Sequence, residues 1–103
     1  MYVLIWNFRV RVGAEQVFRT EYGADGKWAR LFSRASGFEG TELAQSVKDE
    51  RSFYTLDTWH SQEAFERFRE DYAVEYETLD REFESLTESE HFIGSVGQRF
   101  SSS

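Results

Sequence analysis

The segment spanning residues 2–10 constrains the fold most strongly, because a strand through it would be apolar on both faces. The segment is rich in β-branched and aromatic residues, which is typical of a β-strand. Successive side chains of a strand point to opposite faces. The two resulting sets are Leu4, Trp6, Phe8 and Val10 on one face, and Val3, Ile5, Asn7 and Arg9 on the other. A strand of this kind has to be covered on both sides.

The remaining sequence alternates between helical and strand patterns. Apolar residues at helical spacing predict helices over residues 14–22, 27–35 and 61–86, with Ser61 as an N-cap and a kink near Asp71. Strand patterns cover residues 41–47, 52–59 and 91–100. The short polar turn between the second and third strands makes them an antiparallel hairpin.

The order β-α-β-β-α-β predicts an α+β, ferredoxin-like fold with a four-stranded antiparallel sheet. Right-handed crossovers place the helices on one face of this sheet. The first strand is apolar on the other face as well, so we expect a second copy of the chain to cover it, sheet against sheet. The sequence therefore predicts a homodimer of the dimeric α/β-barrel kind.

Aromatic residues support this view. The chain of 103 residues contains ten Phe, five Tyr and three Trp. This is more large apolar surface than a small core readily hides, and it indicates a dimer interface, a ligand cavity or both. The alternative is a core that is simply rich in aromatic residues.

The charge and the apolar pattern exclude several classes of partner. The net charge of −7 disfavours nucleic acid and anionic membrane surfaces. No apolar run approaches the ~20 residues of a membrane span, and residues 1–6 do not read as a signal peptide. We expect one domain over residues 1–100, a tail over residues 101–103, and a cytoplasmic location.

Several motifs resemble the antibiotic biosynthesis monooxygenase family, and together they cover nearly the whole chain. These motifs are Trp6-Asn7-Phe8-Arg9-Val10, Glu21-Tyr22-Gly23, Trp28, Leu31-Phe32, Gly37-Phe38-Glu39-Gly40-Thr41, Asp57-Thr58-Trp59-His60-Ser61-Gln62-Glu63-Ala64-Phe65 and Tyr76-Glu77-Thr78-Leu79-Asp80. The resemblance implies a small homodimer with a pocket between sheet and helices. It also implies oxidation of a quinol or polycyclic phenol by O₂ without metal or flavin, and hence no cofactor.

The same resemblance allows a comparison with the haem-degrading branch of the family. That branch uses an Asn in the first strand, a Trp in the second helix and a His ten residues later. Asn7 matches the first position, but Phe68 stands at the Trp position and Thr78 near the His position. Without that His the iron has no proximal ligand, so the sequence argues against haem degradation.

Three residues are candidate catalytic groups. Asn7 interrupts an apolar strand, and we place it on the helix-facing side, as a ligand-facing donor or as an amide satisfied by backbone or water. The Tyr72 hydroxyl could bond a phenolate or relay a proton, or its ring could simply belong to the core. Trp59 could wall the pocket or plug the barrel rim.

Five further residues are candidates for contact with a small aromatic ligand. They are Trp28, Phe32, Phe68, Tyr76 and His91. The alternative for Trp28, Phe32 and Phe68 is a place in the core, and for Tyr76 it is a core ring with its hydroxyl at the surface. We expect His91 at the mouth of the pocket. The carboxylates of Asp80, Glu84, Glu88 and Glu90 read as solvated faces. No metal-ligand spacing and no nucleotide or hydrolase motif occurs.

Three functions remain open on the sequence alone. The first is a cofactor-independent monooxygenase, and the second is a non-catalytic dimeric binding domain for a small aromatic molecule. The third is an interaction protein with a solid core. A cavity separates the third from the other two, and turnover separates the first from the second.

Overall fold

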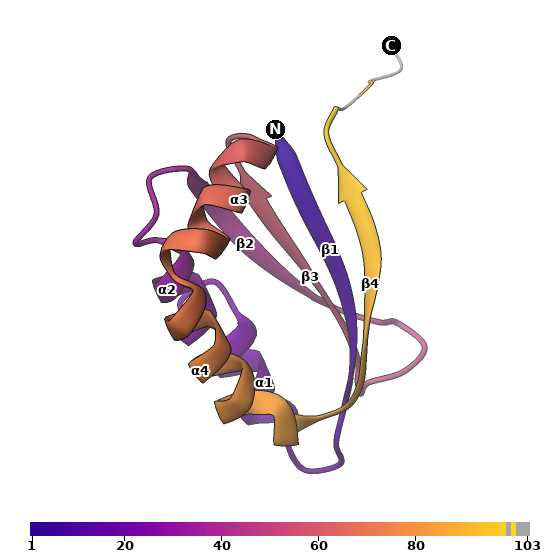
Figure 1. The fold of residues 1–103 in the computed structure, drawn as a ribbon. Coiled ribbons are helices and arrows are strands. Elements are labelled where there is room, and N and C mark those ends of the chain that lie inside the picture. The colour runs from indigo at the N-terminus through magenta and orange to yellow at the C-terminus, as the bar shows by residue number, and fades with distance from the viewer. Residues whose placement is uncertain (99, 101–103) are drawn as a thin grey trace.

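The chain forms a four-stranded antiparallel sheet with its helices on one face, as expected (Figure 1). The structure is a computed structural model that describes residues 1–98 and 100, so the expected tail at residues 101–103 lies outside the described residues. The strands are β1 (Tyr2–Val10), β2 (Phe38–Gln45), β3 (Ser52–Trp59) and β4 (Thr87–Val96). The helices are α1 (Glu15–Tyr22), α2 (Lys27–Phe32), α3 (Gln62–Asp71) and α4 (Ala73–Phe83), followed by the 3₁₀ turn η1 (Glu84–Leu86).

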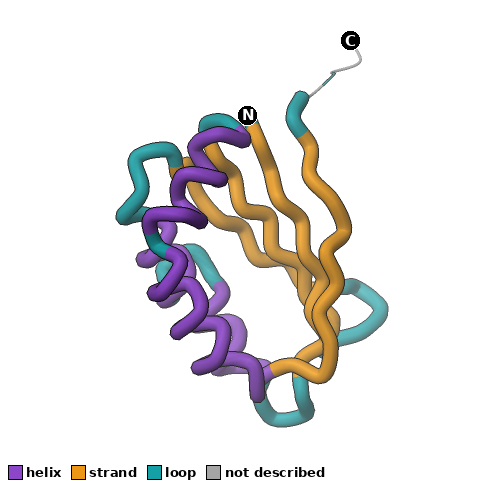
Figure 2. Tube along the Cα trace, in the orientation of Figure 1, coloured by secondary structure: helices purple, strands orange, loops and turns teal. Residues whose placement is uncertain are grey.

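The strand order is β2-β3-β1-β4, so β1 is central and pairs with β3 and β4 (Figure 2). This is the ferredoxin-like arrangement, with two helices in each crossover: α1 and α2 were predicted as separate helices, and the predicted helix over residues 61–86 divides into α3 and α4. None of the helices in the described part of the chain has the length and hydrophobicity needed to cross a membrane.

Helix boundaries follow local chemistry. The Ser61 side chain accepts a hydrogen bond from the backbone N–H of Ala64 at 3.1 Å, which caps the start of α3. The helical region then breaks at Tyr72, close to the predicted kink. At Gly37 a β-carbon would lie 2.4 Å from the β-carbon of Ala64, so only glycine allows this loop to approach α3 so closely.

Strand β4 differs from its predicted boundaries. It starts at Thr87 and ends at Val96, whereas we predicted residues 91–100. The first four residues of β4 are polar, and the register shifts twice along its pairing with β1. A bulged strand does not keep a strict alternation of two, so its apolar pattern is weak.

The core lies between the helices and the inner face of the sheet, and it is largely aromatic. Phe18 and Tyr22 stack with their ring centroids 4.1 Å apart, and Trp59 packs 5.0 Å from Phe68. The largest fully buried side chains are Trp59, Phe18, Phe53, Phe68 and Val10. Part of the aromatic surplus is therefore ordinary core, which was the alternative explanation for it.

Candidate active site

A cavity lies between the inner face of the sheet and the helices, with about 60 Å³ accessible to the centres of water molecules. Its walls are largely aromatic, but several polar side chains point toward the same space. The lining residues are Trp6, Phe8, Tyr22, Trp28, Phe32, Thr41, Thr55, Asp57, Tyr76, Asp80 and Glu90. An apolar pocket with a few polar groups is the usual form of a small-molecule site.

A second hollow of about 350 Å³ adjoins this cavity and leads toward the surface. The two spaces share four lining residues, which are Trp6, Phe32, Asp57 and Tyr76. Tyr2, Phe65, Arg69 and Phe92 line the outer part of the second hollow. We call the first space the inner cavity and the second the outer hollow. Together they have the size range of a site for a ring-containing ligand.

Asp57 lies at the junction of these two spaces. It is an inward-facing residue of β3, directly opposite Leu4 on β1 and Thr41 on β2. Burial raises the pKa of its carboxyl group to about 6, and the hydroxyl of Thr41, which donates a hydrogen bond to Oδ1, partly offsets that rise. The carboxylate is therefore ionised near neutral pH, yet it holds a proton far more readily than an exposed aspartate.

Other polar groups of the site are suited to donate hydrogen bonds. Burial raises the pKa of Tyr76 above its ordinary value, so its hydroxyl stays protonated at neutral pH. The indole Nε1 groups of Trp28 and Trp59 are buried and have no hydrogen-bond partner among the described residues. Trp28 lines the inner cavity and Trp59 the outer hollow. Buried donors without a partner are costly to the folded state.

Carboxylates also line the far end of the inner cavity. Asp80 and Glu90 remain exposed, yet both belong to its wall, so their interpretation as purely solvated faces is incomplete. Burial, and secondarily the neighbouring Asp80, raises the pKa of Glu90. In the described residues no three His, Cys, Asp or Glu side chains come together as a metal site.

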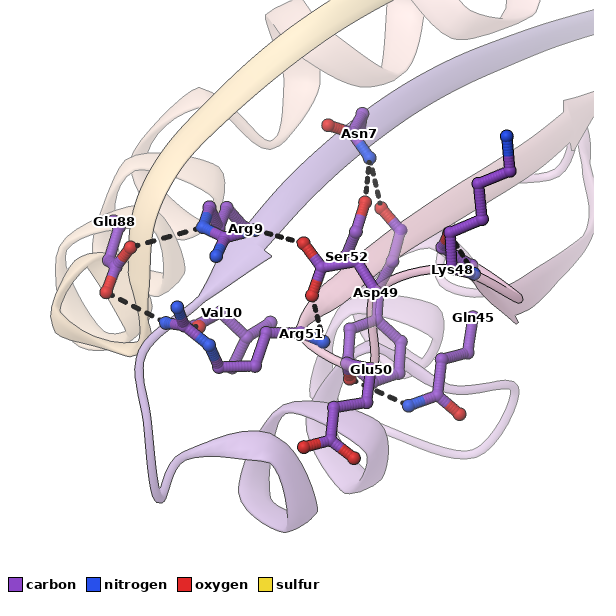
Figure 3. Close-up of polar contacts among 12 residues, drawn as sticks. Asn7, Arg9, Val10, Gln45, Lys48, Asp49, Glu50, Arg51, Ser52 and Glu88 are labelled. Carbon is purple, nitrogen blue, oxygen red and sulfur yellow. Dashed lines mark hydrogen bonds and ion pairs between the residues drawn. The ribbon is translucent and has the colours of Figure 1, made fainter.

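The structure corrects the placement of Asn7. The residue lies on the helix-free face of the sheet, because the inward-facing residues of β1 are the even-numbered ones that join the core. Its side-chain Nδ2 donates to Ser52 Oγ at 3.0 Å and to the carbonyl oxygen of Phe53 at 3.1 Å (Figure 3). The prediction that Asn7 faces the helices was wrong, and its amide is satisfied locally, which was the alternative interpretation.

Charged residues surround Asn7 on this side of the molecule. Arg9 forms ion pairs with Asp49 and with Glu88, the latter at 3.5 Å, and Arg51 reaches Glu88 at 3.0 Å (Figure 3). These pairs tie the β2–β3 turn to the start of β4. Asn7 thus belongs to a structural polar network away from both cavities.

The other two candidate catalytic residues, Tyr72 and Trp59, also do not line the same space. The Tyr72 hydroxyl donates to the carbonyl oxygen of Arg34 at 3.1 Å, and Tyr72 lines neither the inner cavity nor the outer hollow. Trp59 is fully buried and lines the outer hollow. The three predicted catalytic residues therefore do not converge on one space.

The predicted ligand-contacting residues divide into two groups. Trp28, Phe32 and Tyr76 line the inner cavity, as expected for contact with a ligand. Phe68 is only 1% exposed and belongs to the core beside Trp59. His91 is exposed and pairs with Asn7 on the helix-free face, so its expected place at the pocket mouth was wrong.

Asp57 was missed as a site residue although the sequence carries a signal for it. Residues 53, 55, 57 and 59 share one face of the predicted third strand, and three of them are Phe, Thr and Trp. Aspartate is depleted in strands, and on an inward face it is especially unfavourable. Thr41 and Thr55 carry weaker signals, because threonine is common in strands.

Comparison with known proteins gives a consistent picture. The family model described as antibiotic biosynthesis monooxygenase matches residues 1–93. No curated protein sequence gives a significant match.

Solved structures share the fold at low sequence identity. A variant of SnoaB, a cofactor-independent oxygenase of Streptomyces nogalater, is 19% identical with a TM-score of 0.75, over 97% of this chain and 94% of that one. A protein of Bordetella bronchiseptica named as an antibiotic biosynthesis monooxygenase is 15% identical with a TM-score of 0.74, over 96% and 97%. A variant of MhuD that binds two manganese protoporphyrin IX molecules is 18% identical with a TM-score of 0.71, over 100% and 99%.

Proposed function

Because this chain belongs to the antibiotic biosynthesis monooxygenase family, we propose that it is a cofactor-independent monooxygenase acting on a quinol-like or polycyclic phenolic small molecule. The observation that carries this proposal is Asp57, a carboxylate with a pKa of about 6 at the junction of two aromatic-lined spaces. A base with a pKa close to the working pH is suited to take a proton from a weakly acidic phenol or anthrone.

The first step is proton transfer from substrate to Asp57. The ring system lies between the aromatic walls, and its acidic O–H or C–H group faces the carboxylate. The proton moves to Asp57, which leaves the substrate as an anion and the carboxyl neutral. The substrate anion then faces a neutral Asp57 carboxyl, and the Tyr76 hydroxyl is available to donate a hydrogen bond to it.

The second step is transfer of electrons from the substrate anion to O₂. For an anthrone-like CH₂ group, the carbanion adds O₂ to form a peroxide anion, which takes back the proton held by Asp57. The hydroperoxide then loses water across its C–H and O–O bonds and leaves a carbonyl. One oxygen atom enters the product and the other leaves as water, so the substrate itself is the reductant. Aromatic walls that exclude water protect the anion from reprotonation.

Oxygen uptake with a panel of hydroquinones and anthrones tests this proposal. We expect turnover above autoxidation, and a rate that falls as the pH drops through about 6, because Asp57 must be ionised to act as base. Asp57→Asn should lower the rate about 100-fold or more, whereas Asp25→Asn, at an exposed loop position, should leave it unchanged. Thermal stabilisation by these compounds without oxygen uptake would instead identify a non-catalytic binding domain.

We further propose that the protein works as a homodimer through the helix-free face of the sheet. Apolar side chains lie on this face at residues that no helix covers, including Ile5, Tyr54, Leu56 and Val96. Tyr54 and Val96 are respectively 37% and 45% exposed. Apolar surface of this kind is unusual on a sheet that stays in contact with water.

Light scattering coupled to size-exclusion chromatography tests the dimer. We expect a mass of two chains at micromolar concentration. Tyr54→Glu should shift the protein toward a single chain, because it introduces a charge into the contact. Val74→Glu is the matched control, since Val74 is exposed on α4 away from the sheet. A single chain in the unsubstituted protein would refute the dimer.

A further inference from the structure

Arg69 stands out because it is the one cation among the described residues that line the outer hollow. It is an exposed residue of α3, and its guanidinium lies 4.0 Å from the centroid of the Tyr76 ring. Within the described residues Arg69 forms no ion pair, whereas Lys27, Arg34 and Arg81 each pair with a carboxylate. The side chain is thus held by an aromatic ring, and its hydrogen-bonding groups remain available.

The distribution of charge along the two connected spaces is strongly asymmetric. The inner cavity is lined by the carboxyl groups of Asp57, Asp80 and Glu90. The outer hollow is lined by one carboxyl group, Asp57, and one guanidinium group, Arg69. An anionic group on a ligand is repelled from the inner end and attracted to the outer one. The net charge of −7 disfavours anions over most of the surface, so a local cation marks the place where an anionic group is favoured.

We propose that Arg69 forms a carboxylate subsite, and that the natural substrate is a hydroxylated aromatic acid whose carboxylate lies at the opposite end from the reacting group. The planar guanidinium matches the two oxygens of a carboxylate. With the carboxylate on Arg69, the phenolic end of the ligand enters toward Asp57 and Thr41.

This inference rests on the proposed function for the identity of the reacting end, but the subsite itself is a matter of binding. Arg69 therefore acts as a specificity-determining residue that sets which end of the substrate enters first. Its removal should weaken the binding of acids more than the binding of neutral compounds.

Anaerobic titration calorimetry with 6-hydroxy-2-naphthoate and 2-naphthol, which differ only in the carboxylate, tests the subsite without turnover. We expect the acid to bind about tenfold or more tightly than the neutral compound, with an advantage that shrinks as NaCl is raised. Arg69→Gln should abolish the advantage, and Arg69→Lys should restore part of it. Arg67→Gln, two residues away on the same helix, should retain it, since Arg67 lines neither space.

The results separate the subsite from the proposed oxygenation. A preference for the acid that depends on Arg69 supports the subsite even where no compound is oxidised. Three results would each overturn the subsite: equal binding of the acid and the neutral compound, binding of neither at millimolar concentration, or an acid preference that survives Arg69→Gln. Oxygen uptake with neutral quinols remains the separate test of the proposed function. If quinols and their carboxylated analogues are both oxidised, Arg69→Gln should raise KM for the acids by a larger factor than KM for the neutral substrates.

Discussion

Replacement of Asp57 by Asn should make the protein more stable at neutral pH while removing its activity. The carboxylate lies in a largely apolar site, and its neutral form is the one that burial favours. Asparagine is neutral at every pH and has nearly the same shape. Its side-chain oxygen can still accept the hydrogen bond that Thr41 donates to Asp57. The variant therefore keeps the local packing and loses only the ionisation.

The size of the effect follows from the shift of the pKa. The pKa of Asp57 rises from 3.8 to about 6 on folding, which corresponds to roughly 3 kcal/mol at 1.36 kcal/mol for each pKa unit. A carboxyl group whose pKa is raised binds its proton more tightly in the folded state. Its contribution to stability is full below pH 3.8 and is lost as the pH rises through about 6. Relative to that of Asp57→Asn, the free energy of unfolding of the unsubstituted protein should fall by roughly 3 kcal/mol between pH 4 and pH 7.

Urea unfolding at one fixed protein concentration, from pH 4 to pH 8, measures this difference. Subtracting the free energy of unfolding of the unsubstituted protein from that of the variant at each pH cancels the titration of all other groups. The difference should rise between pH 4 and about 6 and then stay constant. Asp25→Asn should give a flat difference, because Asp25 is exposed in the loop between α1 and α2. A flat profile for Asp57→Asn would refute the argument that this carboxyl is desolvated, and with it the assignment of Asp57 as base.

Three further substitutions probe the site and its frame. Thr41→Val removes the hydrogen bond that offsets the burial of Asp57, so the acid limb of the pH–rate profile should move above pH 6, which stopped assays at several pH values would detect. Gly37→Ala should destabilise the protein by ~1–3 kcal/mol in urea unfolding, because the new methyl group meets Ala64. Ser61→Ala should cost about 1 kcal/mol in the same assay, because it removes the cap of α3, and Ser61→Asp should restore most of it.

The fold was largely predictable because its elements are specified by local patterns. The β-branched and aromatic residues of β1, the helical spacing from Phe65 to Phe83, and the cap at Ser61 each match the observed elements. The start of β4 was not predictable in this way. Its first four residues are polar, and one of them, Glu88, pairs with Arg9 and Arg51 in contacts that exist only once the sheet has formed.

The candidate site was harder to predict, because the choice of face depends on the whole sheet. Asn7 was placed on the wrong face although its strand was assigned correctly. Both faces of β1 are apolar, so the sequence alone does not say which one the helices cover. A strand assigned to the wrong face has all of its side chains on the opposite side of the sheet. Asn7 and His91 are paired across β1 and β4, so both lie away from the cavity for the same reason.

The inward position of Asp57 also bears on which of the three candidate functions fits this chain. An interaction protein with a solid core gains nothing from a carboxylate inside its sheet, since an apolar or amide residue there would be more stable by the amount calculated above. The unpartnered indole groups of Trp28 and Trp59 add a second cost of the same kind. Both costs occur in residues that line the two connected spaces, and a bound hydroxylated ring would relieve the first of them by offering a proton to Asp57. A concentration of unfavourable polar groups around one cavity is what a site held ready for a ligand requires, and it favours binding or catalysis over a purely structural role.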